Sequence, residues 1–94
     1  MMNKKKMLLA RKKVDILDKE IFNLIKKRTR IVEYMLTLKN LKKEIVDHKR
    51  INEIIKSIRI KSKKNKVDPK ITMRIWKSMI WSFVDFQRRN FKKK

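Results

Sequence analysis

The chain has 94 residues, with no cysteine and a single histidine, so disulfides and thiolate metal sites are excluded and one His cannot build an ordinary zinc or haem site by itself. Its formal net charge of +21 comes from thirty Lys and Arg against nine Asp and Glu. Such an excess of basic residues is typical of proteins that bind nucleic acid. The cations are spread over the whole chain instead of forming one stripe. Solvated surface charge therefore explains them as simply as a polyanion partner does.

The length predicts one domain, residues 1–94, in which the first six residues form a disordered basic tail. With 41% hydrophobic residues a core is possible, but a monomer of three helices would be marginally stable and dimerisation would strengthen it. The apolar run that follows the basic start, Met7 to Ala10, is too short for a signal peptide or a membrane span. We therefore expect a cytoplasmic protein.

The first predicted element is a long helix from about Met7 to Lys39. The chain has no Gly, and its one Pro comes much later, so nothing interrupts a helix in this region. Such a helix spans roughly 50 Å. Two short helices cannot cover it alone, and we expect a second copy of the same helix beside it.

Two cations lie on the apolar face of this helix. Its second half has apolar residues at steps of three and four: Ile21, Leu24, Ile25, Ile31, Val32, Met35 and Leu38. Arg28 falls within that row and Lys39 continues it, about 16 Å further along the axis. Long basic side chains can snorkel to water, but a cation facing a core is otherwise costly unless it is paired. Because acidic residues are few, a bound anion is a plausible partner.

The rest of the chain predicts two shorter helices. Asn40–Glu44 is a polar connection, and Asp47 is a candidate N-cap for a second, short helix. Ser62–Lys66 is predicted to be a loop. Asp68 followed by Pro69 indicates the start of a third helix, because an Asp cap with Pro at the first position is a strong start signal.

Each of these helices has one apolar face. The second helix carries Ile51, Ile54, Ile55 and Ile58. The third helix carries Trp76, Met79, Ile80, Phe83, Val84, Gln87 and Phe91. Gln87 places an amide among the core-facing positions of the third helix. The prediction is an all-α fold with one long, one short and one medium helix.

The polar residues and their spacing resemble the all-helical chorismate mutase family. The matching pieces are Arg11 with Val14, Asp15 and Asp18, then Arg28 seventeen residues later, Lys39 eleven after that, Asp47 to Arg50, and Gln87 near the end of the last helix. The resemblance covers the chain from about Met7 to Phe91. Each piece alone is weak, but their order and spacing are fairly specific.

The resemblance implies an intertwined helical homodimer whose site binds chorismate, a dicarboxylate. Arg11 and Arg28 are about 25 Å apart along one helix and cannot reach the same ligand from it. In the family, Arg11 enters the site of the other subunit, where it and Arg28 hold the two carboxylates. Lys39 and Gln87 donate to the ether oxygen, and Arg50 completes the cationic wall. The catalytic residues implied are Lys39, Gln87 and Arg28.

The remaining implied substrate contacts are Asp47, which is also the helix cap, Ile51 and Phe83. The family's reaction is a Claisen rearrangement of chorismate to prephenate, a step of aromatic amino-acid biosynthesis in the shikimate pathway. It uses no nucleophile or general base. We therefore expect no metal, no cofactor, no specific nucleic acid and no membrane partner.

One position departs from the family pattern. Typical mutases have Glu directly after the Arg that corresponds to Arg50, where it accepts a hydrogen bond from the hydroxyl of chorismate, and here that residue is Ile51. An apolar residue there is similar to the isochorismate-pyruvate lyase branch, which releases pyruvate to give salicylate. A shift of one residue in the preceding loop could instead bring Glu44 or Glu53 near the site. A basic helical module that binds nucleic acid is the third alternative.

Overall fold

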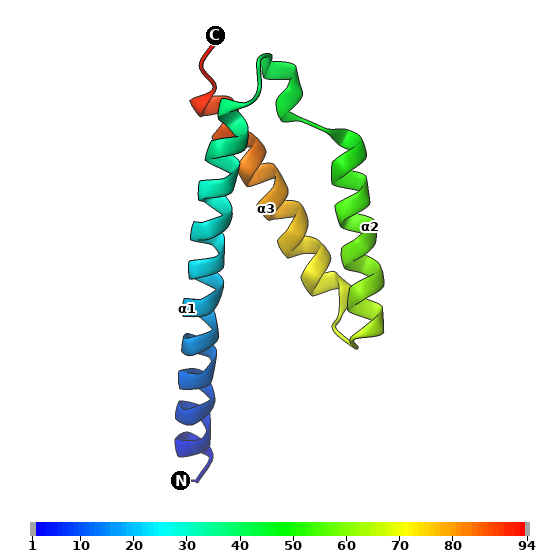
Figure 1. The fold of residues 1–94 in the computed structure, drawn as a ribbon. Helices are drawn as coiled ribbons and strands as arrows, with labels where there is room; N and C mark the ends of the chain where they lie inside the picture. Colours follow the sequence, from blue (N-terminus) through cyan, green and yellow to red (C-terminus); the bar gives the residue numbers. More distant parts are fainter. Residues whose placement is uncertain (1, 94) are drawn as a thin grey trace. The chain divides into compact units, whose positions relative to one another are not determined.

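The computed structural model describes residues 2–93, which form helices and no strand (Figure 1). A long helix α1 (Met2–Thr37) is followed by a short 3₁₀ helix η1 (Lys42–Ile45). The helices α2 (His48–Lys64) and α3 (Pro69–Asn90) complete the fold. The predicted all-α class, with one long, one short and one medium helix, is confirmed.

The chain divides into two units, one ending at Ile31 and one that begins at Val32, and α1 runs through the boundary between them. The described residues of the first unit, 2–31, all belong to α1. Every side chain in it from Asn3 to Lys27 is exposed. Because a helix of this kind has no core of its own, its stability must come from packing against something else.

The exposed face of α1 carries apolar residues at a seven-residue spacing. Two interleaved rows contain Met7, Val14, Ile21 and Met35, and then Leu17, Leu24, Ile31 and Leu38, each 47 to 63% exposed. Arg28 fills the position of the first row that lies between Ile21 and Met35. Apolar rows with this repeat are typical of helices that pack along one another with a left-handed supercoil.

The limits of α1 differ slightly from the predicted range, Met7 to Lys39. The helix begins at Met2, so residues 2–6 of the expected disordered tail are helical in the structure, whereas Met1 lies outside the described residues. Lys and Asn do not break a helix as Pro or Gly does, so the helix can extend to Met2. After Thr37 the amides of Leu38 and Lys39 bond to carbonyls three residues back, at 3.1 and 3.2 Å. The helix therefore tightens as it ends, just before Lys39.

The second unit has a small core. In it, α2 packs against α3, and η1 also contacts α3. Five apolar side chains are at most 9% exposed: Val32, Ile45, Met73, Ile80 and Val84. None of the side chains described is less than 2% exposed. A core of this size supplies limited stabilisation by itself.

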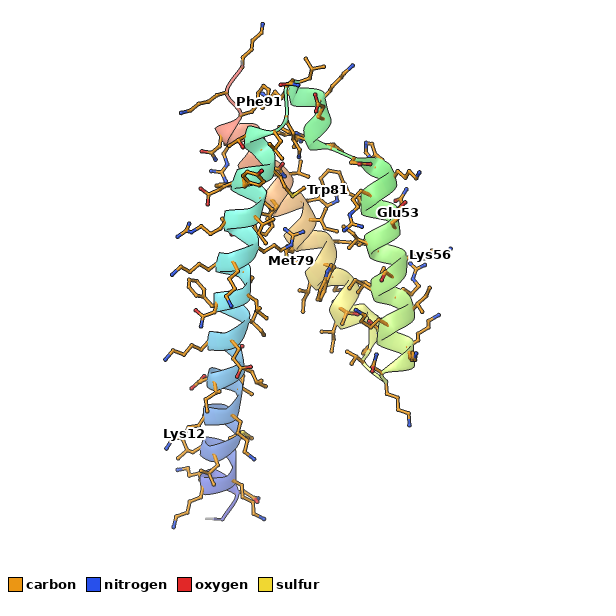
Figure 2. All side chains as sticks on the ribbon, viewed as in Figure 1. Lys12, Glu53, Lys56, Met79, Trp81 and Phe91 are labelled. Atoms are coloured by element: carbon orange, nitrogen blue, oxygen red, sulfur yellow. The ribbon has the colours of Figure 1, made fainter. Side chains whose placement is uncertain are left out.

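The apolar faces that were predicted for α2 and α3 are the faces that are buried in the structure. All four Ile residues of the α2 face are half-buried. Of the face predicted for the third helix, Ile80, Val84 and Gln87 are buried, and the other four positions, which include the C-cap Phe91, are half-buried. Trp81, which lies off this row, is 45% exposed. Trp81 and Met79 are labelled on α3 in Figure 2.

Both predicted N-caps are present. Asp47 Oδ1 accepts a hydrogen bond from the amide of Arg50 at 3.0 Å, at the start of α2. Asp68 Oδ1 accepts from the amide of Lys70 at 2.9 Å, and Pro69 is the first residue of α3. Each carboxylate satisfies an amide that has no partner within its helix.

The predicted loop Ser62–Lys66 was wrong in its first three residues, which belong to α2. Ser62 is 4% exposed, and its hydroxyl lies 2.6 Å from each of two partners, the carbonyl of Ile58 and the hydroxyl of Thr72. Internal partners allow a polar residue to continue a helix instead of ending it.

The actual end of α2 is a Schellman motif. The amide of Val67 donates to the carbonyl of Ser62 at 2.9 Å, and the amide of Lys66 to that of Lys63 at 3.3 Å. Lys66 has a φ of 57°, in the left-handed region that this motif requires and that glycine usually occupies. The left-handed backbone conformation of Lys66 therefore ends the helix.

Candidate active site

The centre of the candidate site is a hydrogen bond between Lys39, two residues after the end of α1, and Gln87, near the end of α3. Lys39 Nζ donates to Gln87 Oε1 at 2.6 Å, and Gln87 Nε2 donates to the carbonyl of Phe83, one turn earlier on α3, at 3.2 Å. Gln87 is 7% exposed and Lys39 is half-buried. The structure therefore brings together the two residues that were predicted to contact the ether oxygen.

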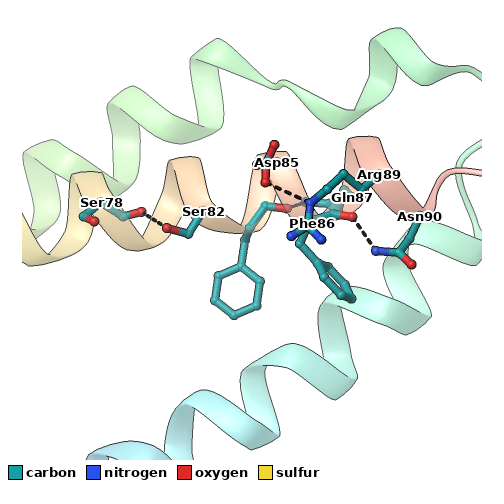
Figure 3. A network of polar contacts seen from close by, with 8 residues as sticks. Ser78, Ser82, Asp85, Phe86, Gln87, Arg89 and Asn90 are labelled. Carbon is teal, nitrogen blue, oxygen red and sulfur yellow. Dashed lines mark hydrogen bonds and ion pairs between the residues drawn. The ribbon is translucent and has the colours of Figure 1, made fainter.

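Figure 3 shows hydrogen bonds near Gln87 that lie within α3. Ser82 donates to the carbonyl of Ser78 at 2.7 Å, and the Asn90 amide donates to the carbonyl of Phe86 at 2.8 Å. Such bonds within one helix leave α3 regular at this end. The buried amide of Gln87 is set apart because it reaches a residue far away in the sequence.

The Lys39–Gln87 pair has donors beyond those already engaged. A lysine ammonium carries three N–H groups and a primary amide carries two. One of each is used in the bonds described above. The pair can therefore aim two donors at one acceptor that develops negative charge, which is the arrangement that stabilises an oxyanion-like transition state.

The electrostatic environment of Lys39 contains opposing effects. Burial lowers the pKa of its ammonium, because removing water disfavours the charged form. The carboxylates of Glu44 and Asp47 raise that pKa and oppose the effect of burial. Both carboxylates belong to the segment that follows Lys39 in the chain.

The start of α2 carries three more of the predicted site residues. Asp47 is exposed and serves as the helix cap, so its predicted role as a cap is confirmed by the bond to Arg50. The side chain of Arg50 is exposed. Ile51 is half-buried on the face of α2 that packs toward α3.

Arg11 and Arg28 lie on the part of α1 that forms the first unit. Arg11 is exposed, whereas Arg28 is half-buried, and burial lowers the pKa of its guanidinium. An arginine remains a cation at neutral pH even so. Their separation of seventeen residues along one helix, about 25 Å, prevents a single chain from bringing these two groups together.

A comparison with protein families shows to which family this chain belongs. The family model described as chorismate mutase type II matches residues 10–88. That range holds the polar residues predicted for the site: Arg11, Arg28, Lys39, Asp47, Arg50 and Gln87. The chain belongs to the chorismate mutase family. Searches of curated proteins and of solved structures found no significant match.

Glu44 and Glu53 are the two acidic residues that could replace the Glu that typical chorismate mutases have at the position of Ile51. Glu53 is exposed and lines a shallow groove of about 610 Å³ on α2, with Lys56, Ser57 and Ile60 among the other lining residues (Figure 2). Glu44 instead acts on Lys39. Of the two, Glu44 is the one with an electrostatic effect on Lys39.

Membrane-spanning helices and metal-ligand clusters were both sought among the described residues. Within residues 2–93, no helix has the combination of length and hydrophobicity that a membrane crossing requires. The same part of the chain has no group of three His, Asp or Glu side chains placed to share a metal ion. The residues that stand out here are cations and an amide, which suit an anionic ligand.

Proposed function

We propose that this protein is an isomerase that converts chorismate to prephenate by a Claisen rearrangement. The observation that carries the proposal is the Lys39–Gln87 pair, a half-buried cation and a buried amide joined at 2.6 Å within the part of the chain that matches the family. In this reaction the ether C–O bond breaks while a C–C bond forms within the same molecule. No nucleophile, general base or metal takes part.

Lys39 and Gln87 act on the ether oxygen in this proposal. Negative charge grows on that oxygen as its bond to carbon lengthens, so donors that are already oriented stabilise the transition state more than the ground state. The bond from Gln87 to the carbonyl of Phe83 supports this role, because it fixes the amide before substrate arrives. Lys39 contributes most as a charged ammonium.

The arginines bind the two carboxylates of the substrate. The planar guanidinium forks of Arg28 and of Arg11 from a second copy are suited to carboxylates. Arg50, at the first turn of α2, supplies the third cation, and Asp47, Ile51 and Phe83 form the rest of the substrate site. Holding both carboxylates fixes the folded conformer in which the reacting carbons are close.

A homodimer is part of this proposal. The apolar rows of α1 are 47 to 63% exposed in one chain, and a second α1 has the same rows to set against them. The small core of residues 32–93 also favours a partner that adds buried surface. Arg11 of one copy then has a site to reach in the other.

A second candidate reaction is favoured by Ile51. An isochorismate-pyruvate lyase on the same fold breaks the same kind of ether bond but needs no acceptor for the hydroxyl of chorismate. Ile51 is half-buried on α2 and offers none. The two reactions share the arginines, Lys39 and Gln87 and differ in the position of one hydroxyl on the substrate.

The deciding experiment is to incubate the purified protein separately with chorismate and with isochorismate and to identify the products by chromatography. Prephenate from chorismate supports the mutase. Salicylate and pyruvate from isochorismate, without prephenate from chorismate, support the lyase. No turnover of either compound above that of the Lys39→Ala variant would contradict both.

A further inference from the structure

A pocket of about 430 Å³ lies where α1 and α3 end, within the second unit. Its lining includes Thr37, the last residue of α1, and Asn90, the last residue of α3, and continues onto the residues that follow α3. The residues that line it are different from those of the candidate active site. A volume of this order is typical of pockets that hold small molecules.

The apolar part of the lining consists of Leu36 from α1 and Phe86 from α3. Both side chains are half-buried, whereas the other lining residues are exposed. The inner wall of the pocket is therefore apolar and its rim is polar. A ligand with an aromatic or large aliphatic group can bury that group against Leu36 and the ring of Phe86.

Positive charge at the rim comes from Lys92 and Lys93, which follow the end of α3. Arg89, the cation that precedes them, is paired with Asp85 at 2.9 Å and is not a lining residue. Two ammonium groups at one rim suit a carboxylate, which can accept hydrogen bonds from both.

Negative charge is present at the same rim. Glu33 of α1 lines the pocket, and a carboxylate can accept from several donors at once. The pocket also lies at the C-terminal ends of two helices, where the last carbonyls carry partial negative charge. One carbonyl there, that of Phe86, already accepts from the side chain of Asn90 at 2.8 Å (Figure 3). Such surroundings favour an ammonium on the ligand.

We propose that this pocket binds a free α-amino acid with an aromatic or large aliphatic side chain. The carboxylate of the ligand lies against Lys92 and Lys93, its ammonium against Glu33, and its side chain against the apolar wall. A simple amine would leave the two lysines without a counterpart, and a simple carboxylate would leave Glu33 without one. The proposal does not depend on the reaction proposed above, because binding is measured without turnover.

The experiment is an NMR titration of the ¹⁵N-labelled protein, at physiological salt, with three compounds that share one side chain. They are phenylalanine, hydrocinnamate, which lacks the ammonium, and phenethylamine, which lacks the carboxylate. The amide shifts of the lining residues give each Kd. We expect phenylalanine to bind, and the other two to bind roughly threefold or more weakly, as the loss of one exposed charge pair implies. Equal affinities, or no shift at the lining residues, overturn the proposal.

Two sets of substitutions at exposed positions separate the charges. Lys92→Gln with Lys93→Gln should weaken the binding of phenylalanine and hydrocinnamate but not that of phenethylamine. Glu33→Gln should weaken the binding of phenylalanine and phenethylamine but not that of hydrocinnamate. Lys56→Gln with Lys64→Gln, in the exposed groove on α2, is the matched control and should change no affinity. Equal losses in the control and in the variant of Lys92 and Lys93 would show that overall charge, and not this pocket, binds the ligand.

A further variant separates this pocket from the candidate active site, which is also proposed to bind carboxylates. Arg28 does not line the pocket, so Arg28→Ala should leave the affinity for phenylalanine unchanged. A loss of affinity there, with none in the variant of Lys92 and Lys93, places the ligand in the candidate active site and overturns the proposal. Phe86→Ala should weaken all three compounds, and if it does not fold, the charge variants still decide the question.

Discussion

The ammonium of Lys39 is hydrogen-bonded to the amide of Gln87, which lies 48 residues later in the sequence. Lys39 is half-buried and Gln87 is buried, whereas most polar residues of the chain are exposed. A buried amide that lacked partners would cost about 1–3 kcal/mol. Gln87 avoids this cost because Lys39 and the carbonyl of Phe83 occupy both ends of its amide. The residue is therefore held in one orientation before any ligand binds.

Replacing Lys39 by Ala should lower kcat by about a hundredfold or more, because one oriented donor to the ether oxygen is lost. Steady-state kinetics with chorismate and isochorismate measure the effect. Lys56→Ala, on the exposed groove of α2, is the matched control and should leave kcat unchanged. Full activity in a folded Lys39→Ala protein would remove the centre of the proposed mechanism.

Replacing Ile51 by Glu should change the preference between substrates. A carboxylate there can accept from the hydroxyl of chorismate, so the ratio of mutase to lyase activity should rise. Product analysis with both substrates measures that ratio. Ile60→Glu, at a site 58% exposed on the same helix, is the control for an added charge. A fall in the ratio for Ile51→Glu relative to this control would count against the assigned position of Ile51.

Some of these residue-level features could be predicted from sequence and others could not. Lys39 and Gln87 lie on apolar rows of their helices, and this placement predicted two polar groups facing a core. The orientation of the Gln87 amide was not predictable, because it depends on the bond that Nε2 donates to the carbonyl of Phe83. The effect of Glu44 on Lys39 depends on how η1 packs on α3, which no local pattern states.

At the scale of elements, the turn between α2 and α3 carries a measurable strain. Lys66 adopts a left-handed conformation, and a residue with a Cβ pays roughly 1 kcal/mol to do so. Lys66→Gly should therefore raise the free energy of unfolding by up to about 1 kcal/mol. Urea denaturation measures the difference.

Lys64→Gly is the matched control for that change. Lys64 is the last residue of α2 and has an ordinary helical conformation, so glycine there should lower the free energy of unfolding by up to about 1 kcal/mol. Both substitutions remove one exposed lysine. Equal effects of the two would show that charge, and not the backbone conformation of Lys66, determines the result.

The helices were predictable where a physical signal was local. Asp68 with Pro69 marked the start of α3, and the spacing of the four Ile residues on α2 marked its covered face. The end of α2 was misplaced because Ser62 and the lysines around it have the composition of a loop. Ser62 stays helical through a contact with Thr72, which lies on another helix.

At the scale of the whole molecule, the proposed dimer can be tested by complementation. Arg11→Ala and Arg28→Ala chains should each be inactive alone, because every site then lacks one arginine. After refolding together, random pairing should restore about a quarter of wild-type activity, since half of the dimers are mixed and each has one intact site of two. No recovery beyond the sum of the parents, despite demonstrated mixing, would contradict an Arg11 supplied by the second copy.

The large positive charge leads to a prediction about the rival function. Binding to double-stranded DNA should be independent of sequence and should weaken steeply as salt rises, because it would rest on contacts of scattered Lys with phosphates. Fluorescence anisotropy with two unrelated duplexes over a range of salt concentrations measures this. A clear preference for one duplex near physiological salt would favour a nucleic-acid-binding module instead.

The exposed first unit also bears on how long a single chain survives in a cell. An isolated helix in water frays and opens easily, and this one carries exposed Lys and Arg from Lys4 to Lys27. A chain outside the proposed dimer therefore offers a protease both an unfolded backbone and basic residues to cleave. Pairing in that dimer should protect the same segment, so the turnover of this protein would select for assembled molecules.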